Sequence, residues 1–121
     1  MTMRTSALLV ALAALILTPL HAHAHATLDR ASPRVGSTVA AAPRELSLWF
    51  TENIEPALSS VEVRNAAGVR VDQGRARRGA APNLLQVGLK PLPPGTYQVR
   101  WRVLSVDTHR TEGSFSFQVG Q

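Results

Sequence analysis

Histidine has the clearest capacity for metal chemistry in this sequence, and its four copies are unevenly distributed. His21, His23 and His25 alternate with alanine near the start, and the fourth is His109. His109 follows Asp107 by two residues, so in extended backbone the two side chains project from the same face. An imidazole and a carboxylate placed in this way can converge on one metal ion.

The residues before His25 are typical of a secretory signal peptide. Arg4 gives a positive start, residues 7–17 form a run of 11 apolar residues, and Pro19 follows before the alanine–histidine tract. The apolar run is well short of the roughly 20 residues that a membrane-spanning helix needs. We therefore predict that residues 1–24 are a cleaved signal peptide and that residues 25–121 form a periplasmic domain without a stable membrane anchor.

The cleavage position decides which residue carries the new α-amine. Signal peptidase prefers small residues at positions −3 and −1, and Ala22 and Ala24 would place His25 first in the mature chain. Cleavage two residues earlier or later would leave His23 or Thr27 first. An N-terminal histidine presents an amine and an imidazole on one residue, and these two nitrogens can close a chelate ring on a metal.

With His25 first, the candidate donors are one amine, two imidazoles and one carboxylate, from His25, Asp107 and His109. Tetragonal sites of nitrogen and oxygen favour Cu(II), which also stands above Zn(II) in the Irving–Williams order. The amine must lose its proton, so binding should strengthen as the pH rises from mildly acidic values. Surface histidines and short Asp-x-His spacings also occur by chance, so these residues alone leave a metal-free surface open.

Sulfur ligands are missing from the predicted mature chain. The sequence has no cysteine, and both methionines, Met1 and Met3, lie in the predicted signal peptide. Cu(I) prefers thiolate and thioether ligands. We therefore predict one Cu(II) ion per mature chain and poor binding of Cu(I).

The size and charge of the predicted mature chain restrict its partners. Residues 25–121 suffice for one domain with a modest core. Arg4 is the only basic residue in the signal peptide, so the 97 mature residues keep 12 basic against 8 acidic side chains, a formal charge of +4. These charges are scattered, which argues against a nucleic-acid partner. A cluster at Arg75, Arg77 and Arg78 could dock an acidic partner or anionic lipid headgroups, but we interpret residues 73–83 as a solvated, mobile loop.

Apolar and polar residues alternate with a period of two, and no helical period lasts more than a turn. Strands with one buried face are predicted at 46–51, 61–64, 85–89, 97–103 and 115–119. Glycine- and proline-rich turns separate them, so we predict an all-β antiparallel sandwich or small barrel. Trp101 is expected in the core, and Trp49 and Tyr97 are interpreted as packing residues.

Four groups of motifs run in order along the predicted mature chain. They are His25-Ala26-x-Leu28 with Ser32-Pro33-x-x-Gly36, Phe50-Thr51-Glu52-Asn53, Pro94-Gly95-Thr96-Tyr97-x-Val99-x-Trp101-Arg102-Val103, and Ser105-x-Asp107-Thr108-His109 leading into Gly113-Ser114-Phe115-Ser116-Phe117. Together they resemble the CopC family of periplasmic copper-resistance proteins, and the last two groups are the specific ones. The resemblance implies an immunoglobulin-like Greek-key β-sandwich of about seven strands.

The resemblance also implies a site and a partner. It places the Cu(II) ligands on His25, Asp107 and His109, and it selects cleavage before His25. Glu52 matches an acidic position near that site, where a supporting or weak-ligand role and a solvated strand end both stay open. Some members carry a methionine-rich Cu(I) loop, but residues 64–83 contain neither Met nor His. The chain therefore resembles the Cu(II)-only members, and the implied partner is a CopD-type inner-membrane copper protein. The sequence does not determine the oligomeric state, and we expect a monomer.

Two other functions remain as alternatives. An N-terminal histidine with a second histidine is also the copper brace of lytic polysaccharide monooxygenases. Those enzymes must reduce their copper to Cu(I), which a carboxylate ligand disfavours, and this chain has little spare surface to bind a polysaccharide. We therefore expect no enzymatic activity. A metal-free immunoglobulin-like module is compatible with the fold but leaves the conjunction of His25, Asp107 and His109 unexplained. Sequestration and delivery of copper look the same in sequence.

Overall fold

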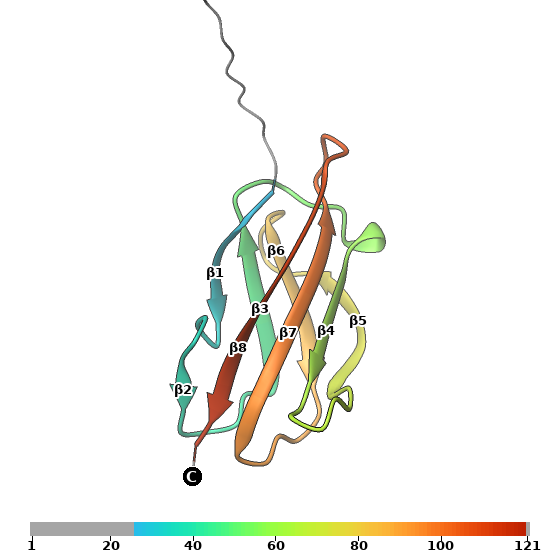
Figure 1. Ribbon diagram of the computed structural model, residues 1–121. Helices are drawn as coiled ribbons and strands as arrows, with labels where there is room; N and C mark the ends of the chain where they lie inside the picture. Colours follow the sequence, from blue (N-terminus) through green and yellow to red (C-terminus); the bar gives the residue numbers. More distant parts are fainter. Residues whose placement is uncertain (1–25, 121) are drawn as a thin grey trace, which may run out of the picture.

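Two four-stranded sheets face each other in the computed structural model, which describes residues 26–120 (Figure 1). One sheet has the order β1 (Leu28–Ser32), β3 (Glu45–Phe50), β6 (Leu84–Leu89), β5 (Asp72–Arg78), and the other has the order β2 (Thr38–Val39), β8 (Arg110–Val119), β7 (Gly95–Leu104), β4 (Ser60–Arg64). A 3-10 helix, η1 (Pro56–Leu58), precedes β4. The predicted Greek-key β-sandwich is confirmed. The described part has eight strands instead of about seven, because β2 is an additional strand of two residues. The predicted signal peptide and His25 lie outside the described residues.

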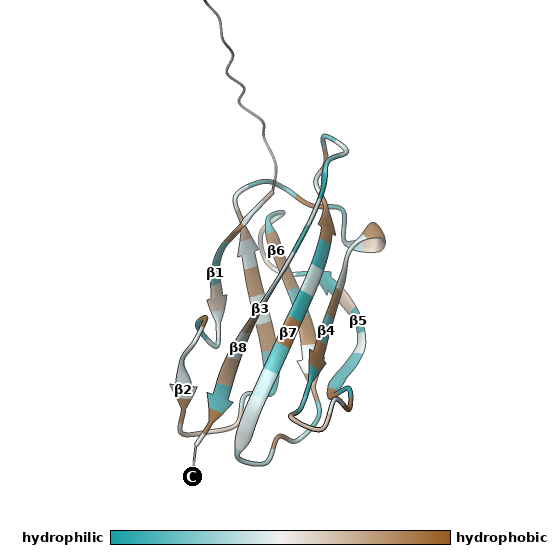
Figure 2. Cartoon of the chain, in the orientation of Figure 1, coloured by the Kyte–Doolittle hydropathy of each residue, from teal (hydrophilic) through white to brown (hydrophobic). Residues whose placement is uncertain are grey.

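The core forms because alternate residues of each central strand face the opposite sheet. Along β7 the side chains of Tyr97, Val99, Trp101 and Val103 are buried, and the residues between them are exposed. Figure 2 shows changes of hydropathy along the strand as coloured bands. Trp101 packs edge-on against Phe50 of the other sheet, with ring centroids 5.2 Å apart. The expectation that Trp101 is a core residue is therefore confirmed.

The other two predicted packing aromatics lie in different surroundings. Tyr97 is buried and stacks on Phe117, with ring centroids 5.6 Å apart, as expected of a core residue. Trp49 is half-buried on the outer face of its sheet, where the guanidinium of Arg30 lies 3.8 Å from the ring centroid. Trp49 thus packs against a cation from β1 instead of joining the core.

The prediction of a mobile loop at residues 73–83 is wrong for the first half of this segment. Asp72–Arg78 form strand β5, which pairs with β6 at the edge of the first sheet, and only residues 79–83 form the turn. Most side chains of β5 are exposed and Ala76 is half-buried, so no apolar alternation marks the strand. Exposed charges are also a common protection of edge strands, which explains why the sequence pattern resembled a solvated loop.

The β7–β8 hairpin sets the position of the candidate site. The two strands pair without interruption from Gly95 opposite Val119 to Leu104 opposite Arg110. Their connecting turn, residues 105–109, extends beyond the sandwich at the end where β1 begins (Figure 1). The end of β3 lies at this same end, so three chain segments meet there. No helix among residues 26–120 has the length and apolar character needed to cross a membrane.

Candidate metal centre

The turn at residues 105–109 holds two of the predicted ligands. The Ser105 N–H donates to the His109 carbonyl at 2.9 Å, and the Thr108 N–H donates to the Ser105 carbonyl at 2.9 Å. Thr108 has a φ of 72°, an uncommon conformation for a β-branched residue. Strained backbone of this kind often occurs at functional sites, and here it lies between the two candidate ligands.

Asp107 and His109 are brought together by this turn. The distance from His109 Nδ1 to Asp107 Oδ1 is 3.4 Å, and the two side chains are half-exposed, at 51% and 42%. We predicted both side chains on one face of extended backbone, whereas the structure places them in the tight turn. Their proximity was therefore predicted correctly for the wrong geometric reason.

Ser105 is hydrogen-bonded to both candidate ligand residues. Its side chain is 1% exposed, its hydroxyl donates to Asp107 Oδ1, and its oxygen accepts the His109 N–H at 3.2 Å. The Ser105 hydrogen bond, with a smaller contribution from His109, holds the pKa of Asp107 below its ordinary value. Asp107 is thus kept as an anionic oxygen donor. Sequence reasoning assigned Ser105 no role, because a serine two residues before an aspartate is a weak signal.

The start of the described chain is fixed beside this turn. Ala26 is fully buried, and its carbonyl accepts a hydrogen bond from Thr111 Oγ1 at 2.5 Å. The Thr27 N–H donates to Thr51 Oγ1 at 3.0 Å, and the Thr51 N–H donates back to the Thr27 carbonyl at 2.9 Å. These contacts clamp residues 26–27 between the end of β3 and the start of β8. These contacts could not be predicted from the sequence, since they join residues far apart in the chain.

Glu52 lies near this end of the sandwich but is not joined to the other two side chains. It is half-buried and lies shortly after the end of β3. The backbone carbonyl of the next residue, Asn53, accepts a hydrogen bond from the Val106 N–H at 3.0 Å. Within residues 26–120, no ion pair links Glu52 to Asp107 or His109. The structure therefore puts Glu52 in the neighbourhood of the turn without assigning it a contact.

The described residues supply part of a metal site. One imidazole and one carboxylate lie close together and are partly exposed to solvent. Residues 26–120 contain no group of three or more His, Asp or Glu side chains that could hold an ion. Two such donors suit a borderline cation such as Cu(II), but a tetragonal ion needs further nitrogen or oxygen donors. The missing donors must come from solvent, from a partner or from residue 25, which lies outside the described residues.

Comparison with protein families and curated relatives gives consistent matches. The CopC domain model matches residues 28–120. The chain is 37% identical over 123 residues to copper resistance protein C of Xanthomonas campestris pv. juglandis, with 96% of each chain covered. It is also 29% identical over 109 residues to copper transport protein CutJ of Bacillus subtilis, where the match covers 88% of this chain and 20% of the longer protein.

Solved structures extend this likeness to three dimensions. The crystal structure of CopC from Methylosinus trichosporium OB3b matches with a TM-score of 0.75 and 37% identity, covering 79% of this chain and 94% of the other. PcoC, described as a methionine-rich copper resistance protein from Escherichia coli, matches with a TM-score of 0.72 and 33% identity, covering 79% and 99%. Both likenesses combine fold and sequence over the whole sandwich.

Proposed function

The chain belongs to the CopC family and is a copper-binding copper-resistance protein, and we propose that it holds one Cu(II) ion at the 105–109 turn. In this proposal the ligands are the α-amine and imidazole of His25, the carboxylate of Asp107 and the imidazole of His109. The amine becomes available when the signal peptide, residues 1–24, is removed. Glu52 then supports the ligands from the end of β3 without binding the ion directly.

The clamped start of the chain is the observation that carries this proposal. Residue 25 is bonded to Ala26, so their Cα atoms are about 3.8 Å apart. Ala26 is hydrogen-bonded to Thr111, and His109 lies two residues before Thr111, about 7 Å along an extended chain. Strands β1 and β8 run in the same direction, and the 105–109 turn lies at the end of the sandwich where β1 begins (Figure 1). A histidine at position 25 is thereby within reach of the same ion.

The preference for Cu(II) follows from the donor atoms. Asp107 is kept anionic by Ser105, and an anionic oxygen with three nitrogens is a hard to borderline set that suits Cu(II). Residues 25–121 contain no methionine or cysteine, in contrast to the relative described as methionine-rich. Firm binding of Cu(I), which prefers sulfur, is therefore not expected of this chain.

We further infer that the protein works in the periplasm and delivers its copper to an inner-membrane protein of the CopD type. The match to part of a longer copper transport protein supports delivery, because there a domain like this one is joined to additional chain. An oxidase or monooxygenase activity is not expected, since a carboxylate among the ligands disfavours the Cu(I) state that oxygen activation requires. The mature protein is expected to be a monomer.

The N-terminal amine provides the sharpest test. A chain beginning at His25 is compared with one beginning Gly-His25, because the added glycine replaces the basic amine at that position by an amide while keeping every side chain. We expect the glycine to weaken Cu(II) binding at least about tenfold in a competition titration with a colorimetric chelator, as loss of one chelate ligand should. Each chain is also prepared with His109→Ala. Equal affinities of the two starts would show that the amine is not a ligand.

The side-chain ligands and the stoichiometry are tested with the same assay. His109→Ala and Asp107→Ala should each weaken Cu(II) binding, whereas thermal unfolding of the metal-free variants should stay close to wild type because both side chains are half-exposed. The wild-type chain should bind one Cu(II) tightly. A second tight Cu(II) site, firm Cu(I) binding, or a loss of several degrees in a metal-free variant would contradict the assignment.

A further inference from the structure

A groove runs along the open side of the sandwich, where the edge strand of one sheet faces the edge strand of the other. It lies between β4 and β5, has a volume of about 660 Å³, and is bounded at one end by η1. Apolar surface from Pro56, Ala57, Val61 and Ala76 lines it. None of the candidate metal ligands contributes to the groove, so it is a separate feature of the fold.

The rim of the groove is strongly basic, and one of its cations is free to bind. Arg77 and Arg70 are engaged by Glu45 and Asp72, and Arg78 donates to the Ile54 carbonyl at 3.4 Å. Within residues 26–120, no hydrogen bond or ion pair engages the guanidinium of Arg75.

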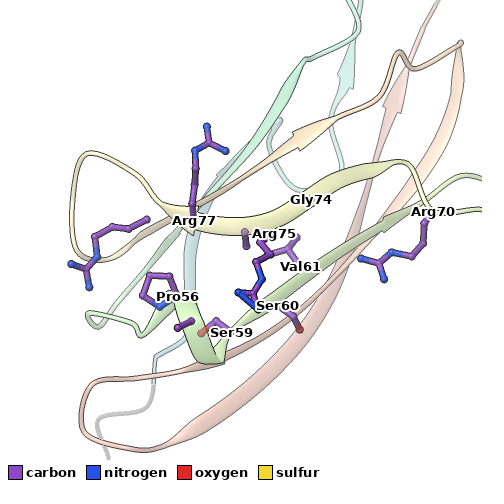
Figure 3. A pocket seen from close by; sticks show the side chains of 11 residues that line it. Pro56, Ser59, Ser60, Val61, Arg70, Gly74, Arg75 and Arg77 are labelled. Carbon is purple, nitrogen blue, oxygen red and sulfur yellow. The ribbon is translucent and has the colours of Figure 1, made fainter.

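Figure 3 shows how these side chains are directed. Arg75 reaches from β5 across the groove toward Ser60 of β4, while Arg77 points away from it. The pairing register of β5 with β6 shifts between Gln73 and Arg77, so Arg75 lies outside the regular pairing of the strand. The irregularity of the strand therefore places an unpaired positive charge in the groove.

The β4 edge offers backbone hydrogen bonds beside this charge. The N–H of Val63 donates to Asp72 Oδ1 at 2.9 Å and its carbonyl accepts the Val71 N–H at 2.8 Å, so the peptide groups of Val63 point away from β7. Val61 is two residues earlier and its peptide groups point the same way. Outside the ladder with β7, no backbone hydrogen bond reaches Val61 within the described chain. Its N–H and carbonyl thus face the groove unpaired.

We propose that this groove docks an extended, acidic segment of a partner protein, which adds as a strand to the β4 edge. The Val61 N–H and carbonyl would pair with the segment's backbone, apolar side chains would contact the groove wall, and acidic side chains would meet Arg75. The backbone groups identify a peptide as the occupant, because the headgroups of a flat bilayer cannot follow a strand edge inside a groove. The basic rim selects acidic peptides by charge complementarity.

The test uses metal-free, isotope-labelled protein and a short capped peptide of alternating glutamate and valine. Addition of the peptide should shift the backbone amide resonances of Ser60, Val61, Arg75 and Ala76, and the Val61 amide should become protected from hydrogen exchange. A lysine–valine peptide of equal length should not bind. The same glutamate–valine peptide with methylated backbone nitrogens should bind much more weakly, because it cannot complete the strand pairing.

Matched variants separate the groove from the overall positive charge. Arg75→Gln and Ala57→Glu change exposed groove residues, and each should weaken peptide binding about tenfold, the loss typical of one charge-assisted contact. Arg34→Gln removes an equally exposed cation outside the groove and should leave binding unchanged. Unfolding midpoints of all three variants confirm that the sandwich is intact.

Several results would overturn the proposal. These are the absence of peptide binding, an equal loss in Arg34→Gln, or unchanged affinity of the N-methylated peptide. Binding to vesicles of phosphatidylglycerol but not to the peptide would identify the groove as a lipid contact and would equally refute it. Because the protein is metal-free throughout, the outcome is independent of the copper site.

Discussion

Asp72 is a buried carboxylate whose removal should cost more stability than any surface charge. Its side chain is 3% exposed and accepts hydrogen bonds from the Val63 N–H at 2.9 Å and from Arg70 at 2.7 Å and 3.1 Å. Val63 is itself fully buried, so its N–H has no access to water once the acceptor is gone. The carboxylate thus holds the corner where β4 and β5 meet, next to the groove.

The cost of Asp72→Ala can be estimated from these contacts. Leaving the buried Val63 N–H without an acceptor costs about 1–3 kcal/mol. The ion pair adds at most about 1 kcal/mol, because the Arg70 side chain is 49% exposed and water screens it. The total of roughly 1–4 kcal/mol corresponds to a fall in Tm of roughly 4–30 °C for a domain of this size. Asp72→Asn keeps an oxygen for Val63 and should cost only about 1 kcal/mol.

The pH dependence gives an independent check on Asp72. Burial alone would raise its pKa, but the hydrogen bonds from Arg70 and Val63 outweigh burial and hold the pKa below the ordinary aspartate value. The folded state therefore binds this proton less readily than the unfolded state. The stabilisation is complete above the ordinary aspartate pKa and is lost as the pH falls through the lower, folded-state value.

Urea unfolding of metal-free protein, followed by circular dichroism from neutral pH to strongly acidic pH, measures both effects. The difference in unfolding free energy between wild type and Asp72→Asn should shrink in acid, when the native Asp72 carboxyl becomes protonated. The pH effects of the other carboxylates are common to both proteins and cancel in this difference. A difference that stays constant across this range would refute the reasoning. So would equal destabilisation by Asp72→Ala and Asp72→Asn, because the Val63 hydrogen bond would then contribute nothing.

Three further substitutions test the site end and the core. Thr111→Val keeps the shape of the side chain but removes the donor to Ala26, so Cu(II) affinity in a chelator competition should fall while the metal-free Tm changes by only a few degrees. Ser105→Ala should also weaken Cu(II) binding, roughly tenfold, as loss of a hydrogen bond to a ligand does. Gly113→Ala would place a Cβ 2.5 Å from Trp101 Cζ2, so urea should unfold this variant at a clearly lower midpoint and its tryptophan emission should shift.

The sequence predicted the strands whose side chains alternate between core and solvent. The β7 residues from Tyr97 to Val103 show this alternation fully, because the strand is central and long. β5 was assigned to a loop because an edge strand with a basic, exposed face buries too little to leave a pattern. β1 was not predicted either, since Ala31 is the one buried residue among its five.

The candidate site shows a similar division between local and long-range information. The closeness of Asp107 and His109 was predicted from their spacing, because both belong to one short turn, while their role as metal ligands stays a prediction. The hydrogen bond between Thr111 and Ala26 joins residues separated by 85 positions, so only the folded sandwich shows it. Ser105 is intermediate, since its spacing is visible in the sequence but its burial, which makes it a support for the turn, is not.

The course of β8 has a practical consequence for handling the protein. The strand begins at Arg110 beside the candidate site and ends at Val119, so its ten residues carry the chain about 30 Å toward the opposite end of the sandwich (Figure 1). A purification tag, a fluorophore or an electrode linker attached after Gly120 would therefore sit far from the turn and leave it open to solvent. The same attachment at the amino end would block the proposed amine ligand, so immobilised copper sensors built on this scaffold should be anchored through the carboxyl end.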